Sequence, residues 1–200
     1  MTPRLPRRIA LITLLGAFLL PLSLSAAEPP AKAANPRVRL STNVGVIELE
    51  LDAQKAPKTV ANFMRYVDRG FYNGTIFHRI IPRFMIQGGG FEPGMKEKKT
   101  DAPIPNEADN GLKNLAGTIA MARTPDPDSA SAQFFINTVD NTPLDHRDKT
   151  LSGWGYAVFG KVTKGMEVVK RIELMASGSV GMHQNVPLQN VTIQKAERIK

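Results

Sequence analysis

The sequence predicts a mainly β domain, a closed antiparallel barrel of seven or eight short strands with one early and one late α-helix. Two observations favour this class. Short apolar segments, several with a spacing near two, recur along the chain between stretches rich in Gly and Pro, as is typical of strands joined by turns. The two helical patterns lie far apart, and neither belongs to the regular strand–helix alternation of a parallel sheet.

The first predicted elements of the domain are a hairpin and a helix. Apolar residues alternate over Val38–Leu40 and over Val44–Leu51, with turn residues between the two runs. Pro57 stands where the first turn of a helix tolerates proline, and Gly70 ends the helical pattern. The apolar residues of this helix recur at helical spacing, at Val60, Phe63, Met64 and Val67. We interpret this stripe as core contact alone.

The segment Phe77–Gly90 is the stretch around which the site is organised. It reads FHRIIPRFMIQGGG, two strand-like apolar runs around a proline, followed by an amide and three glycines. Arg79 is a cation inside the first run. A hairpin would bring this cation close to Phe84, Met85 and Gln87. A lone Arg in a strand most often lies on a solvated face, and the residue pattern alone leaves that alternative open.

The remaining elements follow the same turn-separated pattern. Residues 91–111 are polar and contain several prolines, which indicates a long loop. Three short strands are expected over residues 118–122, 132–138 and 156–162, with turn-rich segments between them. A second helix is expected after Gly165, then a loop over residues 177–187 and a closing strand over 191–199. The stripe of this second helix consists of Met166, Val168, Val169 and Ile172.

The first 27 residues have the three-part pattern of a secretory signal peptide. A basic start precedes an apolar stretch, Ile9–Leu20, and small residues follow at 25–27. A transmembrane anchor needs about 20 apolar residues, so we expect cleavage near Glu28 and no stable membrane anchor. An uncleaved, membrane-tethered form stays the alternative. Residues 28–36 are rich in Ala and Pro and are expected to be a flexible linker before a domain over residues 37–200.

Composition and charge exclude several classes of function. Removing residues 1–27 takes away three Arg and lowers the net charge from +8 to +5, a value that mainly favours solubility. The only cluster of lysines, at residues 96, 98 and 99, is interrupted by Glu97 and lacks interleaved aromatic residues, so we expect no nucleic-acid partner. The chain has no Cys, which excludes thiol nucleophiles and thiolate metal sites.

No pattern in the sequence indicates a cofactor, a metal or a covalent intermediate. His78, His146 and His183 lack the short spacing that metal sites use. The three glycines at residues 88–90 lack the Lys and Ser or Thr of a phosphate-binding loop. They indicate a strand end where the backbone bends or is closely approached.

Three motifs in order resemble the cyclophilins, a family of peptidyl-prolyl isomerases. The motifs are FHRIIPRFMIQGGG at 77–90, SAQFFIN at 131–137 and YAVFGKV at 156–162. The resemblance runs from about Arg37 to Lys200 and is strongest to the periplasmic bacterial branch. It implies a closed eight-stranded antiparallel β-barrel with an α-helix over each open end.

The resemblance also implies roles for individual residues. Arg79 matches the catalytic arginine, and Gln87 and Gln133 match the polar groups that hold the peptide backbone and steady that arginine. The residues that match the pocket for the proline ring are Phe84, Met85, Phe135 and Leu144. Ala122 and Arg123 match groove residues, although the family commonly has Asn where Arg123 stands.

Two departures from the family pattern concern the edge of the pocket. Pro143 stands where eukaryotic members carry a Trp before the Leu-Asp pair, here Leu144 and Asp145. Tyr156 stands where they carry a His, and its ring and hydroxyl can still close the pocket. Because an indole is missing, we expect cyclosporin to bind weakly.

We therefore expect an exported, periplasmic peptidyl-prolyl cis–trans isomerase that acts on X–Pro bonds of folding exported proteins. Isomerisation needs no nucleophile, because a donor to the twisted amide nitrogen lowers the barrier. Arginine suits this role, since it is always charged and presents several N–H groups in a rigid fork. The partners expected are proline-containing segments of unfolded or folding proteins, and the domain is expected to be monomeric. The alternative is a peptide-binding chaperone without catalysis on the same fold.

Overall fold

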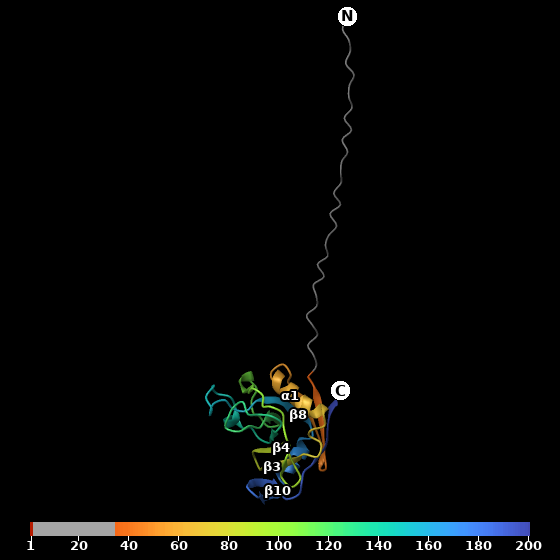
Figure 1. Ribbon diagram of the computed structural model, residues 1–200, viewed down its shortest axis with the longest axis vertical. Coiled ribbons are helices and arrows are strands. Elements are labelled where there is room, and N and C mark those ends of the chain that lie inside the picture. Colours follow the sequence, from red (N-terminus) through yellow and green to blue (C-terminus); the bar gives the residue numbers. More distant parts are fainter. Residues whose placement is uncertain (2–34) are drawn as a thin grey trace. The chain divides into compact units, whose positions relative to one another are not determined.

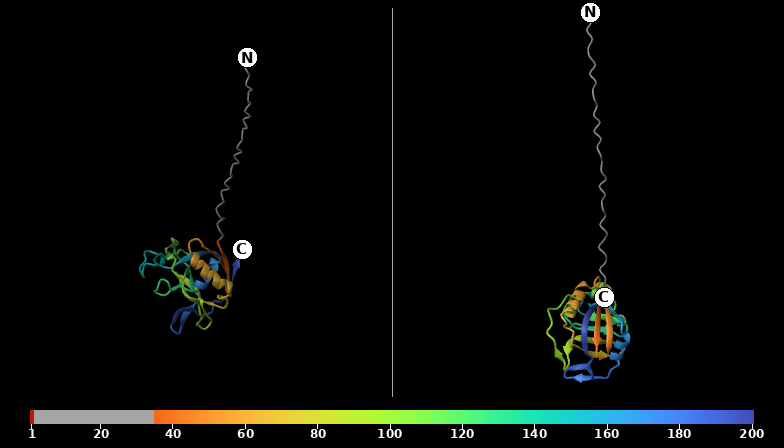
Figure 2. Two further views of the ribbon diagram at one scale, coloured as in Figure 1. Left: turned by 45° about the horizontal axis from the view of Figure 1, so that its top comes forward. Right: turned by 90° about the vertical axis from the view of Figure 1, so that its right-hand side faces the viewer.

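The computed structural model describes Met1 and residues 35–200. The expected signal peptide, apart from Met1, and the linker as far as residue 34 lie outside the described residues. The domain begins at the end of the expected linker, where the carbonyl of Pro36 accepts a hydrogen bond of 2.9 Å from the backbone N–H of Leu51. Figures 1 and 2 show a curled sheet with its helices.

Eight antiparallel strands form one continuous path, in the order β11-β1-β2-β8-β6-β7-β4-β3. They are β1 (Arg37–Thr42), β2 (Gly45–Leu51), β3 (Ile76–Ile81), β4 (Met85–Glu92), β6 (Thr118–Met121), β7 (Phe134–Asn137), β8 (Val158–Lys164) and β11 (Ile193–Ile199). A two-residue strand, β5 (Lys96–Glu97), pairs with β4 outside this path. In the right-hand view of Figure 2, β11 in blue lies beside β1 and β2 in orange. The prediction of a mainly β domain with eight antiparallel strands is confirmed.

The predicted closed barrel is only partly closed, because the two end strands of this path, β3 and β11, do not form a continuous ladder. β3 and the segment before β11 share one isolated bridge, between Ile76 and Thr192. Phe77 N–H donates to the carbonyl of Val191 at 2.9 Å, and Ile193 N–H donates to the carbonyl of Thr75 at 2.8 Å. A few backbone hydrogen bonds therefore join the ends, rather than a full ladder between two strands.

Both predicted helices are present, as α1 (Pro57–Asp68) and α2 (Met166–Glu173). The apolar stripe of α1 is buried and packs against the interior of the sheet, as expected for core contact. The carboxylate of Glu107 accepts hydrogen bonds from the backbone N–H groups of Lys58 (3.0 Å) and Thr59 (2.8 Å). A carboxylate from a distant loop thus satisfies two of the donors left free at the first turn of α1.

Two separate apolar clusters cover the two faces of the strands that carry the site. The interior cluster contains an aromatic group around Phe63, Tyr72 and Phe134, whose neighbouring ring centres lie 5.0–5.6 Å apart. Phe135 follows Phe134 in β7 and therefore faces the opposite side, since side chains alternate along a strand. There it joins Met85, Ala120 and Val158 in a second buried cluster.

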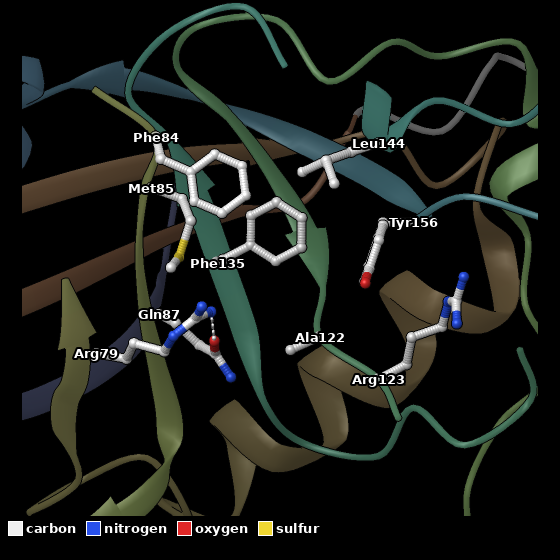
Figure 3. A pocket seen from close by; sticks show the side chains of 9 residues that line it. All are labelled: Arg79, Phe84, Met85, Gln87, Ala122, Arg123, Phe135, Leu144 and Tyr156. Atoms are coloured by element: carbon white, nitrogen blue, oxygen red, sulfur yellow. Dashed lines mark hydrogen bonds between the residues drawn. The ribbon is translucent and has the colours of Figure 1, made fainter. Parts of the chain in front are cut away.

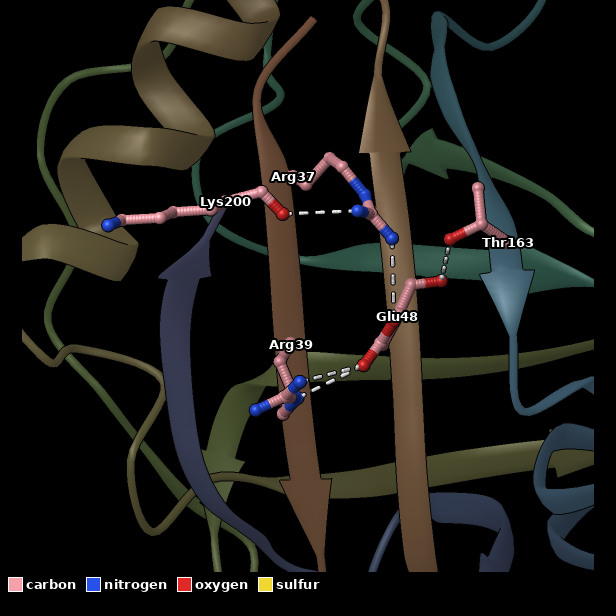
Figure 4. A network of polar contacts seen from close by, with 5 residues as sticks. All are labelled: Arg37, Arg39, Glu48, Thr163 and Lys200. Carbon is pink, nitrogen blue, oxygen red and sulfur yellow. Dashed lines mark hydrogen bonds and ion pairs between the residues drawn. The ribbon is translucent and has the colours of Figure 1, made fainter.

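A polar network covers part of the outer surface of β1 and β2, as Figure 4 shows. Arg39 and Glu48 are paired across the two strands, and the guanidinium donates to the carboxylate at 2.9 and 3.2 Å. Arg37 contacts the same carboxylate at 3.5 Å and the carbonyl of Lys200 at 3.1 Å. The hydrogen bond from Arg39 holds the pKa of Glu48 below its usual value. The network ties the C-terminus to the first hairpin.

Three expected loops contain regular structure. Residues 177–187 form a hairpin, β9 (Ser177–Val180) and β10 (His183–Pro187), and β10 packs against β3. Its apolar residues do not alternate, and a register shift between His183 and Val186 interrupts the pairing, so the period of two is missing. The expected loop 91–111 contains β5 and a 3-10 turn, η1 (Ala108–Asn110), and the turn-rich segment 139–155 contains a second, η2 (Thr142–Leu144). Within the part of the chain that the structure describes, no helix is long and apolar enough to span a bilayer.

Candidate active site

Nine side chains from distant parts of the chain surround one open cavity of about 240 Å³ on the outer side of β4 and β7. Figure 3 shows the nine: Arg79, Phe84, Met85, Gln87, Ala122, Arg123, Phe135, Leu144 and Tyr156. All nine are among the ten residues that the sequence singles out. The tenth, Gln133, is outside the lining and accepts a hydrogen bond from Gln87. The structure thus brings the ten residues together, and their roles in binding and catalysis stay predictions.

A row of three hydrogen-bonded polar side chains begins at one side of the cavity, with two members in its lining and the third outside it. Arg79 in β3 and Gln87 in β4 are directly paired, and the Nη1 of Arg79 donates to the Oε1 of Gln87 at 3.3 Å. The Nε2 of Gln87 then donates to the Oε1 of Gln133 at 3.0 Å. Because one arginine N–H group is fixed by the amide, the guanidinium is oriented while its other donors stay available toward the cavity.

The three glycines of β4 make room for this row and for the core behind it. A Cβ at Gly90 would lie 2.5–2.7 Å from the side-chain atoms of Gln133. At Gly89, where φ is +84°, a Cβ would lie 2.8–2.9 Å from the rings of Phe134 and Tyr72. The expected close approach is therefore present, but the glycines lie inside β4, which runs on to Glu92, and not at its end.

Apolar side chains form the floor and the opposite wall of the cavity. Met85 and Phe135 are buried, and Phe84 and Leu144 are partly exposed at the rim. The rings of Phe135 and Tyr156 meet edge to face with centres 5.6 Å apart. The result is a small apolar recess beside a fixed cation.

Arg123 and Tyr156 form the other end of the cavity, opposite Arg79 in Figure 3. The guanidinium of Arg123 lies 4.6 Å from the centre of the Tyr156 ring. Its Nε donates to the carbonyl of Gly155 at 3.0 Å, and its Nη1 donates to the carbonyl of Thr124 at 2.9 Å. Among residues 35–200 no salt bridge within 4.0 Å involves Arg79 or Arg123. Both cations of the cavity therefore lack a carboxylate partner in that part of the chain.

Several supporting residues carry no signal in the sequence. Asn141 donates from Nδ2 to the carbonyl of Phe84 at 2.9 Å, and Asn114 donates to the carbonyl of Leu144 at 3.1 Å. These buried amides fix the backbone on both sides of the apolar recess. A single Asn in a turn-rich segment resembles any loop residue, so only the fold identifies them.

The histidine next to Arg79 does not face the cavity. His78 is buried against Phe91, with ring centres 4.6 Å apart, and His183 also packs against Phe91, with ring centres 5.3 Å apart. Burial, with a smaller effect from the nearby His183, lowers the pKa of His78 from 6.5 to about 4. Trp154 is also outside the lining and packs against His146 at 5.1 Å.

The described residues that line the cavity include no Ser, Thr, carboxylate or His. Their chemistry is that of a site that binds a small apolar ring and directs N–H donors at a polar group beside it. Such a site can stabilise charge redistribution in a bound molecule without forming a covalent bond to it.

Comparisons with known proteins point in the same direction. A sequence model described as cyclophilin type peptidyl-prolyl cis-trans isomerase/CLD matches residues 37–198. The chain is 55% identical to peptidyl-prolyl cis-trans isomerase A of Dickeya dadantii over 94% of this chain and 97% of that protein. It is 58% identical to peptidyl-prolyl cis-trans isomerase B of Escherichia coli over 78% and 96% of the two chains.

A solved structure shares the fold. It is a cyclophilin type isomerase of Cryptosporidium parvum, crystallised in the presence of the dipeptide Ala-Pro. The match has a TM-score of 0.70 and 28% identity, and it covers 82% of this chain and 99% of that one.

Proposed function

The chain belongs to the cyclophilin-type peptidyl-prolyl cis–trans isomerases and is an enzyme of that class, and from this premise we propose how its cavity isomerises X–Pro bonds and on which proteins it acts. The observation that carries the proposal is the Arg79 guanidinium, fixed by Gln87 at the edge of an apolar recess. The Cryptosporidium parvum relative was crystallised in the presence of the dipeptide Ala-Pro, which is consistent with an X–Pro ligand for this fold.

In the proposed complex the proline ring occupies the recess formed by Phe84, Met85, Phe135 and Leu144. Burying the ring anchors one side of the peptide bond, so that the residue before proline can rotate. The barrier to rotation is about 18–20 kcal/mol because the nitrogen lone pair is delocalised into the carbonyl. Twisting the bond localises that lone pair and makes the nitrogen a hydrogen-bond acceptor.

Arg79 is the catalytic residue in this account. Its free N–H groups donate to the prolyl nitrogen as it becomes an acceptor, and this bond forms only in the twisted state. An interaction that is stronger in the transition state than in the ground state lowers the barrier. Gln87 orients the guanidinium, and Gln133 orients Gln87 through the bond of 3.0 Å. No cofactor takes part in this scheme.

The other cavity residues hold the peptide on either side of proline. The backbone of Ala122 runs beside Gln133, to whose carbonyl its N–H donates at 2.9 Å, and offers an extended edge to the peptide. Arg123 and Tyr156 close the far end. Cyclosporin is expected to bind the same cavity weakly, because the exposed Pro143 next to Leu144 supplies no indole.

We further propose that the enzyme works in the periplasm on exported proteins. This proposal rests on the order of basic, apolar and small residues in residues 1–27, which is typical of a secretory signal peptide. The match to the Dickeya dadantii protein covers 94% of the chain and so extends upstream of Arg37. Mass spectrometry of the protein from an exported fraction is expected to find a chain that begins near Glu28 and is soluble and monomeric. An intact chain in the membrane fraction contradicts this localisation.

The test of the proposed function combines two assays of the mature protein. In a protease-coupled assay, the cis-to-trans conversion of a short X–Pro peptide should accelerate in proportion to enzyme concentration. In the second assay, an exported protein whose refolding is limited by an X–Pro bond, a step of tens to hundreds of seconds, should refold faster. Rescue of refolding without peptide turnover would instead identify a non-catalytic chaperone.

A further inference from the structure

Glu173, at the end of α2, is a charged residue that is almost fully buried outside the cavity. Only 3% of its surface is exposed. A carboxylate at the C-terminal end of a helix is disfavoured by the helix dipole, so other contacts have to compensate for its position. Burial alone would raise the pKa of Glu173, but hydrogen bonds from Thr138, Arg83 and Lys170 outweigh it and hold the pKa below its usual value. The carboxylate is therefore ionised, and each of its oxygens has a hydrogen-bond or ion-pair partner.

One oxygen of Glu173 contacts the turn between β3 and β4. Its Oε1 accepts from the backbone N–H of Arg83 at 2.5 Å and from the hydroxyl of Thr138 at 2.6 Å. Its Oε2 lies 3.2 Å from the ammonium of Lys170, which also donates to the carbonyl of Thr138. The two oxygens thus have separate partners.

The backbone of Arg83 has a strained conformation. Its φ is +59°, in the left-handed region that glycine adopts without cost and other residues rarely do. The side chain of Arg83 is exposed, so side-chain burial does not hold the residue in place. The backbone N–H of Phe84 closes the turn by donating to the carbonyl of Ile81 at 3.1 Å, and such a turn requires positive φ at its third residue. The hydrogen bond from the N–H of Arg83 to Glu173 is the side-chain contact that holds the strained residue there.

The strained residue directly precedes Phe84, which lines the cavity. The carbonyl of Phe84 accepts from the backbone N–H of Thr138 at 3.0 Å and from Asn141 at 2.9 Å. Thr138 therefore contacts both Glu173, through its hydroxyl, and Phe84, through its backbone. Glu173 is therefore connected to Phe84 by two routes, through Arg83, which precedes Phe84 in the chain, and through Thr138.

We propose that Glu173 is a positioning residue for the isomerase reaction: it holds Arg83 in the left-handed conformation and so places the Phe84 ring at the rim of the cavity. The proposal rests on the proposed function of that cavity. It links a buried residue of α2 to the binding of the proline ring, although Glu173 does not line the cavity.

The experiment compares five variants of the mature protein in the peptide assay, each measured well below its melting temperature. Glu173→Ala removes both acceptors, while Glu173→Gln keeps the oxygen that serves Arg83 and Thr138. Arg83→Gly removes the strain, because glycine adopts the left-handed conformation freely. The double variant Glu173→Ala/Arg83→Gly tests whether the two residues act together. Ile172→Val, a buried change on the same helix, is the control for a general loss of stability.

We expect kcat/KM of Glu173→Ala to fall about 10- to 100-fold, the scale of a misplacement remote from the chemistry, with KM raised more than kcat is lowered. Glu173→Gln and Arg83→Gly should stay close to the parent, Ile172→Val should lower the melting temperature without changing kcat/KM, and the double variant should recover most of the loss. Recovery of kcat/KM in the double variant distinguishes a positioning role of Glu173 from a general loss of stability, because Arg83→Gly adds no contact to α2 that could restore stability there.

A folded Glu173→Ala protein with the parental kcat/KM overturns the proposal. A double variant that recovers nothing, or an Ile172→Val protein that loses as much activity as Glu173→Ala, overturns it as well. Where Glu173→Ala alone is unfolded, the double variant is compared with Arg83→Gly, and an unfolded double variant also contradicts the proposal. Failure of the proposed function is a different result, since the parental protein would then turn over no peptide.

Discussion

The Nη1 of Arg79 and the Oε1 of Gln87 lie 3.3 Å apart across the paired strands β3 and β4. This contact fixes the cation at the rim of an apolar recess and uses only one of its five N–H groups. In the proposed mechanism, the guanidinium is therefore oriented before a peptide binds, so little reorganisation is needed when the bond twists.

Replacing Gln87 tests whether this contact orients the cation. Gln87→Ala is expected to lower kcat/KM about 10- to 100-fold, the equivalent of roughly 1.5–3 kcal/mol for a hydrogen bond to a charged group. The peptide assay measures the effect, with Gln54→Ala, an exposed glutamine outside the cavity, as the matched control. Equal turnover by the two variants would show that Arg79 needs no orienting partner.

Arg123 is expected to give the enzyme a preference for acidic residues beside proline. Its guanidinium is fixed by carbonyl groups and by Tyr156, and it has no salt-bridge partner within residues 35–200, so its charge is uncompensated there. Peptides with Glu next to proline should be turned over about two- to fivefold faster than peptides with Lys, as roughly 0.5–1 kcal/mol of ion pairing implies.

The preference should appear as a ratio of kcat/KM values for matched peptides, with Glu or Lys before or after proline. It should disappear in Arg123→Gln and weaken as salt is added. Lys149→Gln removes an exposed cation outside the cavity and should leave the ratio unchanged. A ratio that survives in Arg123→Gln assigns the preference to another group.

Cyclosporin is expected to inhibit this enzyme weakly, while peptide turnover is normal. Pro143 is exposed in η2 beside Leu144, at the place where an indole would add a hydrogen bond and aromatic contact. Losing both should cost about 1–3 kcal/mol, or roughly 5- to 150-fold in affinity. Titration calorimetry of the parent and of Pro143→Trp measures the difference. Tight binding by the parent, or an unchanged affinity in the variant, is the contrary result.

Stability should fall as the pH drops from 6.5 toward 4 because of His78. The pKa of His78 is about 4 in the folded protein and 6.5 in the unfolded chain. Between these two pH values the unfolded chain therefore binds more protons than the folded protein. The contribution of neutral His78 to the free energy of unfolding is complete above pH 6.5, and it is lost as the pH falls from there through the pKa of the folded protein. At about 1.4 kcal/mol per pKa unit it amounts to at most roughly 3 kcal/mol. Thermal melts of the parent and of His78→Phe should show a flatter dependence in the variant, and parallel curves would exclude this role for His78.

Much of the fold could be predicted from the sequence because its elements carry local patterns. α1 combines a proline near its start with a buried stripe of regular spacing, and β4 combines an apolar run with glycines. The hairpin β9–β10 could not be predicted, since its apolar residues do not alternate and its pairing is interrupted. The extent of barrel closure also depends on contacts between distant segments, such as Ile76 with Thr192, which local patterns do not encode.

The candidate site was predictable where its parts are close in sequence. Arg79 and Gln87 are eight residues apart in one hairpin, so pairing alone places them together. Grouping them with Phe135 and Tyr156 required the resemblance to a family. Glu173 could not be predicted, because it meets Arg83 across 90 residues and its position in a helix stripe resembles that of an ordinary solvated carboxylate.

The most direct test of the account is the turnover of X–Pro peptide by Arg79→Ala and Arg79→Lys, with Arg147→Ala as an exposed control outside the cavity. Circular dichroism and melting must first show that each variant is folded. Arg79→Ala should keep most of its peptide affinity and lose about 10²–10³ in kcat, equivalent to about 2.7–4 kcal/mol for one preorganised donor. Arg79→Lys should recover little, since an ammonium lacks the fork of N–H groups. A folded Arg79→Ala protein that turns over peptide as fast as the parent would contradict the mechanism.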